Sequence, residues 1–220
     1  MRLRITFAKT GSLRYTGHLD LHRIWERTLR RAGLPLAYSQ GFHPQPKIQI
    51  AAALPLGFLG REEIIDLWLS DDVRVDPCVH PQADTQVRPY QDMLQPAAPP
   101  GLTILRVEEV DERGPALQTQ VAAAEYEVML LAAGPESGLE RPVADLLAKD
   151  SLPRERRGKP YDLRPLILSL ECASSDRLRM RLSAREGATG RPEEVLDELG
   201  IAFENTRIER TRLILKPAIE

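Results

Sequence analysis

The sequence predicts an α+β protein built from two tandem ferredoxin-like (βαββαβ) units, residues 1–112 and 113–220. The first half reads strand, helix, two strands, helix, strand, which is the ferredoxin-like order. The same order recurs from Glu125 onward, although no residue-level repeat accompanies it. At 220 residues, with 42% hydrophobic and 28% charged residues, the chain is in the globular range and long enough to bury a core.

The most clearly defined element of the first half is a helix between Thr16 and Gly33. Its apolar residues recur with helical spacing and form one stripe: Leu21, Ile24, Trp25, Thr28, Leu29 and Ala32. Thr16 is the expected N-cap and Gly33 the expected stop. Alternating or apolar runs predict strands at 2–8, 47–53, 63–69 and 102–110, and a second helix at 84–94, interrupted at Pro89.

In the second half we expect helices at 116–124, 141–149 and 191–199. Pro142 and Pro192 lie in the first turns of the last two, and Gly200 follows the final one as a C-cap. Strands are expected at 126–132, 165–172, 177–184 and 208–216.

The cysteines and the apolar runs exclude several classes of protein. Cys78 and Cys172 lie far apart, which excludes a cysteine-built zinc site and a three-cysteine iron–sulfur cluster within this chain. The N-terminus has no signal-peptide pattern, and no apolar run approaches the ~20 residues that span a bilayer. We therefore expect a cytoplasmic protein with no cofactor of its own and no membrane partner.

Charge is distributed unevenly along the chain. Residues 1–50 carry nine Lys/Arg against two Asp/Glu, in a chain whose net charge is −2. Such an asymmetry predicts a surface that faces an anionic partner.

Nucleic-acid binding fits this region best. The loop 38–47 combines aromatic, amide and cationic side chains, which hold single-stranded RNA by stacking, base-edge contacts and phosphate contacts. Helix arginines and the basic run 154–159 are expected to extend the positive field. The predicted binding residues are Arg14, His18, Asp20, Arg23, Gln40, Phe42, His43 and Lys47. The arginines and Lys47 would neutralise phosphates, Phe42 would stack, and Gln40 and His43 would read base edges.

Two alternatives stay open. An enzyme could hold a metal with His18, His22 and His43, or use Asp20 as a base, although the HExxH pattern is absent. A pure protein-interaction module is the other alternative. We predict no catalytic residue.

Several of these segments resemble the radical SAM-linked family of unknown function. The segments that carry the resemblance are Arg14-Tyr-Thr-Gly-His-Leu-Asp-Leu, Tyr38-Ser-Gln-Gly-Phe-His-Pro-Gln-Pro-Lys47 and Leu54-Pro-Leu-Gly57. Members occur alone or fused C-terminally to cobalamin-binding radical SAM proteins, often encoded near RNA-processing genes. The resemblance implies no established activity. Together with the basic helix and the loop 38–47, it leads us to expect a non-catalytic accessory of such an enzyme in RNA modification, which binds or presents an RNA or RNA-linked substrate. This chain lacks the CxxxCxxC cysteines, so the radical chemistry would belong to the partner.

Overall fold

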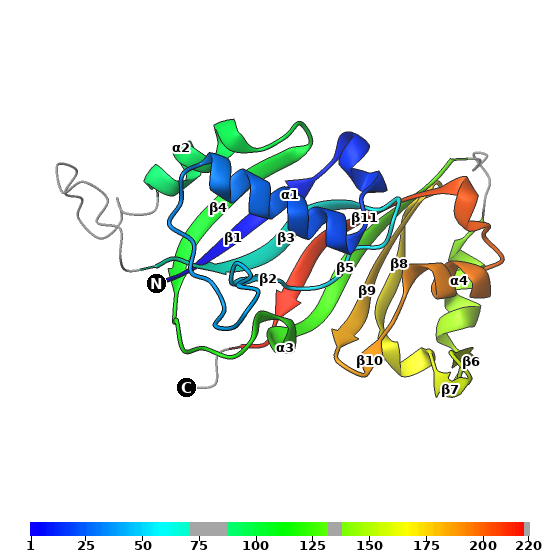
Figure 1. The fold of residues 1–220 in the computed structure, drawn as a ribbon. Coiled ribbons are helices and arrows are strands. Elements are labelled where there is room, and N and C mark those ends of the chain that lie inside the picture. The colour runs from blue at the N-terminus through cyan, green and yellow to red at the C-terminus, as the bar shows by residue number, and fades with distance from the viewer. Residues whose placement is uncertain (71–87, 132–137, 218–220) are drawn as a thin grey trace. The chain divides into compact units, whose positions relative to one another are not determined.

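The computed structural model describes residues 1–70, 88–131 and 138–217 (Figure 1). The chain divides into two compact units, unit 1 (Met1–Gln120) and unit 2 (Val121–Glu220), which are described in turn. Both combine helices with an antiparallel sheet, which confirms the predicted α+β class.

Unit 1 contains four strands and two main helices. In chain order they are β1 (Arg2–Lys9), α1 (His18–Arg31), β2 (Ile48–Ile50), β3 (Leu59–Trp68), α2 (Arg88–Ala97) and β4 (Leu102–Val110). A 3-10 helix, η1 (Gly11–Tyr15), precedes α1, and a single turn, α3 (Leu117–Gln120), ends the unit. The strand order is β2–β3–β1–β4, with every neighbouring pair antiparallel.

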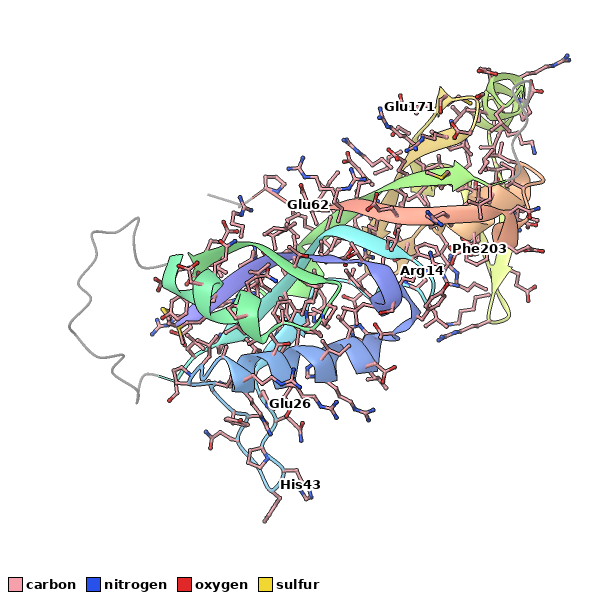
Figure 2. The ribbon with its side chains drawn as sticks, turned by 90° about the horizontal axis from the view of Figure 1, so that it is seen from above. Arg14, Glu26, His43, Glu62, Glu171 and Phe203 are labelled. Atoms are coloured by element: carbon pink, nitrogen blue, oxygen red, sulfur yellow. The ribbon has the colours of Figure 1, made fainter. Side chains whose placement is uncertain are left out.

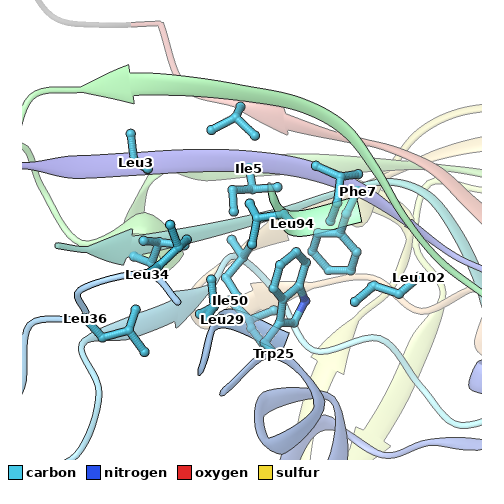
Figure 3. Packing of buried hydrophobic residues seen from close by; sticks show 14 of the residues in the cluster. Leu3, Ile5, Phe7, Trp25, Leu29, Leu34, Leu36, Ile50, Leu94 and Leu102 are labelled. Atoms are coloured by element: carbon cyan, nitrogen blue, oxygen red, sulfur yellow. The ribbon is translucent and has the colours of Figure 1, made fainter. Parts of the chain in front are cut away.

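The core of unit 1 lies between this sheet and its two helices (Figure 3). Leu3, Ile5 and Phe7 alternate along β1 and point toward α1, which is the outcome expected of a period-2 strand. The Phe7 and Trp25 rings meet edge to face with centroids 4.9 Å apart. The predicted apolar stripe of α1 is therefore the surface that packs on the sheet.

The start of α1 differs from the prediction. Gly17 occupies the N-cap position and no side chain caps the helix, so the prediction of Thr16 as N-cap is wrong. The Thr16 hydroxyl instead donates to the Leu13 carbonyl oxygen at 2.7 Å, which closes η1. The predicted stop is confirmed, because Gly33 has φ 70°, a conformation that favours glycine.

Unit 2 contains a sheet and a separate hairpin. Its elements are β5 (Val121–Leu130), α4 (Glu140–Leu147), β6 (Pro153–Arg156), β7 (Lys159–Asp162), β8 (Ile167–Ser174), β9 (Arg177–Arg185), β10 (Ala188–Thr189), α5 (Pro192–Glu198) and β11 (Thr206–Leu215). Strand β5 pairs with β9 and β11, and β9 also pairs with β8 and β10, all antiparallel. Strands β6 and β7 pair only with each other among the described residues.

Three element predictions need correction. The helix expected at 116–124 is wrong: α3 ends at Gln120 and Val121 begins β5. The alanine-rich run favours a helix on its own, but pairing with β9 and β11 on its two edges overrides that preference. The β6–β7 hairpin was not predicted at all. Residues 84–87 of the predicted second helix lie outside the described residues, and the helix that follows runs on to Ala97.

Candidate nucleic-acid interface

The segment before α1 positions Arg14. This residue lies in η1, where its guanidinium lies 4.6 Å from the Tyr15 ring centroid and donates to the Tyr15 hydroxyl. The Arg14 carbonyl oxygen accepts a 2.7 Å bond from the Gly57 N–H, which ties η1 to the loop before β3. Arg14 is therefore held against an aromatic ring at one end of α1.

The solvent face of α1 carries a stripe of arginines. Arg23, Arg27 and Arg31 are spaced by four residues and exposed, and we call them the arginine stripe. Arg23 lies 3.7 Å from the Asp20 carboxylate, an exposed pair that contributes little to stability. Arg27 and Arg31 have no ion-pair partner within the described ranges. Their charge is therefore available to an anionic ligand.

The predicted loop is the end of a closed hairpin formed by residues 36–47, which we call the projecting hairpin. Ser39 N–H donates to the Gln45 carbonyl oxygen at 2.8 Å, and Gln45 N–H donates to the Ser39 hydroxyl at 3.0 Å. Below this closure, Lys47 N–H donates to the Ala37 carbonyl oxygen at 2.9 Å. Gly41 has φ 135°, which side chains rarely tolerate, so glycine is needed at the turn.

Three predicted site residues lie together at the tip of this hairpin. Gln40, Phe42 and His43 are exposed, and the Phe42 side chain is fully exposed. Figure 2 shows His43 at the far end of the projecting hairpin, pointing away from the rest of unit 1. The tip thus presents an aromatic ring, an amide and an imidazole to solvent on a backbone that its own hydrogen bonds close.

The base of the hairpin borders an open recess of about 420 Å³. The residues that line it, which define the Trp68 recess, are Ser39, Gln45, Pro46, Lys47, Ile48, Gln49 and Trp68. Leu67 and Leu69 point into the core, so alternation places Trp68 on the sheet face opposite α1. Lys47 is the one predicted site residue that lines the recess.

The structure therefore groups the predicted residues in three places. Asp20 and Arg23 share the exposed face of α1, and His18 begins that helix. The hairpin tip holds Gln40, Phe42 and His43, and Lys47 belongs to the Trp68 recess. Arg14 lies apart from these groups, in η1.

Part of the N-terminal positive charge is internal to unit 1. The Asp66 carboxylate, fully buried, accepts from Arg2 Nη2 at 2.6 Å and from Arg4 Nε at 2.8 Å. Lys9 is buried as well, and its Nζ donates to the Thr16 carbonyl oxygen at 2.9 Å. These three cations are among the nine counted in residues 1–50, so the charge that faces solvent is smaller than the sequence predicts.

Two arginines of the second basic run are also neutralised. Arg154 lies 2.5 Å from the Asp197 carboxylate on α5, and Arg156 lies 2.7 Å from that of Glu194. The Arg156 guanidinium also lies 4.7 Å from the Tyr161 ring centroid. The expectation that Arg154 and Arg156 extend the positive field is therefore wrong, because α5 supplies their counter-charges.

Arginines on the exposed sheet surface of unit 2 also form ion pairs with carboxylates. Arg177 lies 2.7 Å and Arg179 3.7 Å from the carboxylate of Glu127, and Arg181 lies 2.5 Å from that of Glu125. These are cross-strand pairs between β9 and β5. Each of these three arginines already has a carboxylate partner, so this surface is less suited to a polyanion than the arginine stripe.

The histidines predicted as an alternative metal site are placed on different elements. His18 and His22 lie on α1, and burial lowers the pKa of His18, with the neighbouring His22 lowering it further. His43 lies at the hairpin tip. Across residues 1–70, 88–131 and 138–217, no group of three or more His, Cys, Asp or Glu side chains is arranged to hold a metal ion.

Sequence reasoning missed Trp68 as a candidate residue. The signal was present, because Trp68 lies between the apolar Leu67 and Leu69 in a predicted strand, and alternation puts it on the other face. Trp68 and Lys47 are brought together by pairing between segments far apart in the sequence, which no local pattern reveals.

Comparison with protein families gives a match over most of the chain. A family model described as an uncharacterized protein conserved in bacteria (DUF2344) covers residues 2–192. No curated protein matches the chain. In the part of the chain that the structure describes, no helix combines the length and apolarity needed to cross a bilayer.

Proposed function

The chain belongs to the DUF2344 family, and we propose that it is a non-catalytic RNA-binding accessory of a cytoplasmic, cobalamin-binding radical SAM enzyme. In this role it binds or presents an RNA or RNA-linked substrate. The observation that carries the proposal is the full exposure of Phe42 at the tip of a hydrogen-bonded hairpin. The link to a radical SAM partner rests on the sequence resemblance alone.

The hairpin tip suits an unpaired base. An exposed aromatic ring buries apolar surface when a base stacks on it. Such stacking tolerates any base, because every base has a π-face. Gln40 and His43 flank Phe42 with groups that can donate to or accept from base edges. The tip would therefore contact bases and supply little of the charge.

The arginine stripe supplies the charge for this proposal. Arg27 and Arg31 have no carboxylate partner among the described residues, so neutralising a phosphate there breaks no existing ion pair. Each such contact releases counterions from the nucleic acid, which makes the affinity depend on salt.

Strand order supports tandem ferredoxin-like units as the architecture behind this function. In unit 1 the order β4–β1–β3–β2 places the first and third strands of a βαββαβ unit in the centre. In unit 2, β11–β5–β9–β8 is the corresponding order when β6, β7 and β10 are treated as additions. We propose that the two units are copies of one design in which the first carries the RNA surface.

The direct test is binding of a fluorescein-labelled, unstructured single-stranded RNA to the full chain, followed by fluorescence anisotropy. Phe42→Ala should weaken binding by about 1–3 kcal/mol, the usual contribution of one stacked base. Leu168→Ala, which also truncates an exposed apolar side chain, is the matched control and should have no effect. Equal affinities of Phe42→Ala and the unchanged chain would contradict the proposal.

A second candidate function, a protein-interaction module, is favoured by a different observation. Tyr15, Leu19 and Leu56 are large apolar side chains that stay mostly exposed. The bond between Arg14 and Gly57 joins the segments that carry Tyr15 and Leu56. If this surface binds the enzyme, the partner should co-purify after RNase treatment, and Leu19→Asp should abolish the co-purification. Loss of the partner on RNase treatment would favour the RNA-binding function instead.

A further inference from the structure

We propose that the Trp68 recess binds one nucleotide, with the base ring against Trp68 and the phosphate at Lys47. This inference rests on the proposed RNA-binding function and deepens it, because it assigns a specific subsite to Lys47. The ligand class is a planar heteroaromatic ring that carries a phosphate. It could come from an unpaired nucleotide of an RNA chain or from a free nucleotide.

The Trp68 side chain is held rigidly. The Arg2 guanidinium lies 4.7 Å from the Trp68 ring centroid. Arg2 is itself fixed, since it donates to the Asp66 carboxylate at 2.6 Å and to the Gly114 and Pro115 carbonyl oxygens at 3.0 and 3.1 Å. Arg2 is only 1% exposed and does not line the recess. Arg2 thus holds the Trp68 ring in place from outside the recess, which lowers the ordering cost of a ligand that contacts the ring from the recess.

The polar side chains that line the recess offer hydrogen-bond donors. Gln49 Oε1 already accepts from the Leu117 N–H at 2.9 Å, which fixes the amide and leaves its NH₂ group to donate. The Ser39 oxygen accepts from the Gln45 N–H, which leaves the Ser39 O–H to donate. These groups complement the carbonyl and ring-nitrogen acceptors of a base.

The charge and the volume of the Trp68 recess both fit a single nucleotide. Lys47 is exposed and is the only charged residue among the described residues that line the recess, so the site favours an anion. A volume of about 420 Å³ lies within the range of small-ligand sites, roughly 300–1,000 Å³. The recess is therefore large enough for one nucleotide and too small for a duplex.

The sequence provides a direct reporter for the test, because it has two tryptophans, Trp25 and Trp68. Trp25 is fully buried, and its Nε1 has no hydrogen-bond partner in the part of the chain that is described. Trp25→Phe therefore loses no hydrogen bond and leaves Trp68 as the single tryptophan fluorophore. Adenosine, guanosine, cytidine and uridine 5′-monophosphates are titrated into this variant of the full chain.

We expect at least one of the four nucleotides to quench Trp68 fluorescence saturably. Adding Lys47→Ala should weaken that binding by about tenfold or more, the typical loss when a charged hydrogen bond is removed. Lys47→Arg should restore most of the binding. The nucleoside without its phosphate should bind as weakly as the nucleotide does to Lys47→Ala, and inorganic phosphate alone should leave the fluorescence unchanged.

The inference is overturned if none of the four nucleotides gives a saturable signal, or if Lys47→Ala binds as tightly as the parent. Should Trp25→Phe fail to fold, isothermal titration calorimetry of the unaltered chain and of Lys47→Ala measures the same difference. Competition then separates the two sources of ligand. A mononucleotide that displaces labelled RNA indicates an RNA subsite, and one that binds beside the RNA indicates a free nucleotide.

The two proposals fail separately. If RNA binding depends on Phe42 while nucleotides give no signal at Trp68, only the recess assignment falls. If nucleotides bind through Lys47 while RNA does not bind, the RNA-binding function falls and the recess remains a nucleotide site.

Discussion

Two hairpins of this protein carry basic residues, and the structure uses them in opposite ways. In the β6–β7 hairpin, Arg154 and Arg156 pair with carboxylates on α5 and fix the hairpin to that helix. In the projecting hairpin, Lys47 and the tip residues make no ion pair within the described residues, and Phe42 is fully exposed. Arginines of the first hairpin thus hold it to its own unit, whereas the side chains of the second hairpin stay available for a ligand.

The same division runs through the N-terminal fifty residues. Arg2 and Arg4 are bound to Asp66 inside unit 1, whereas Arg27 and Arg31 face solvent on α1. A count of charges along the sequence therefore predicts a binding surface only when cations with internal partners are left out of the count.

The largest effect is expected for Asp66→Asn. Removing this carboxylate leaves the buried Arg2 without its counter-charge, which should lower the free energy of unfolding by about 3–5 kcal/mol. Urea denaturation measures the change. Asp20→Asn breaks an exposed pair with Arg23 and should change stability by less than about 0.5 kcal/mol. Similar small effects for both variants would mean that the Asp66 cluster is not structural.

A smaller loss of stability is expected in the β6–β7 hairpin. Arg156→Ala removes a part-buried, two-pronged hydrogen bond to Glu194 and a contact with the Tyr161 ring. Stability should fall by about 1.5–3 kcal/mol, the range for hydrogen bonds to charged groups, and RNA affinity should stay unchanged. Lys159→Ala in the same hairpin is exposed and serves as the neutral control. Weakened RNA binding in correctly folded Arg156→Ala would show that the β6–β7 hairpin also contributes to RNA binding, which contradicts the proposed difference between the two hairpins.

The arginine stripe should show the opposite profile. The double variant Arg27→Ala/Arg31→Ala should fold normally and bind RNA more weakly. Its log–log salt slope should fall by about 1.4, since each phosphate contact on a single strand contributes about 0.7.

The charge-matched control for the stripe is Lys159→Ala/Arg185→Ala in unit 2, which removes two exposed cations elsewhere. An equal fall of the salt slope in the control would show that RNA senses net charge and not the stripe.

The smallest effect concerns pH. Burial lowers the pKa of His18 below its ordinary value of 6.5, so the unfolded chain binds this proton more readily than the folded chain. Folding favours the neutral form of His18, so the contribution of this residue to stability is fully present above pH 6.5. It is lost as pH falls through 6.5 toward the folded pKa, because the unfolded chain takes up the proton first. Because His18 is only partly shielded from water, the loss should be small, and His18→Gln should remove it. Urea denaturation at about pH 7.5 and about pH 5.5 measures the difference, and an unchanged pH dependence in His18→Gln would assign it to another group.

The sequence predicted the elements whose causes are local. The apolar period of α1, its glycine stop and the exposed, glycine-turned loop around Phe42 all follow from neighbouring residues. The N-cap was wrong because the Thr16 hydroxyl bonds back to Leu13 and not forward into the helix.

What the sequence could not supply depends on distant partners. Asp66 lies 64 positions from Arg2, and Glu194 lies 38 positions from Arg156, so no local pattern reveals that these arginines are neutralised. The Trp68 recess forms for the same reason only when β3 brings Trp68 beside Lys47. Long-range pairing decides which charges remain free.

The most direct test of the central claim is ultraviolet crosslinking of single-stranded RNA to the full chain, followed by mass spectrometry of the crosslinked peptides. The account predicts crosslinks in the peptides that contain Phe42 and the arginine stripe, with none in the β6–β7 hairpin. Crosslinks that fall mainly on residues 153–162, or that persist unchanged in Phe42→Ala, would contradict it.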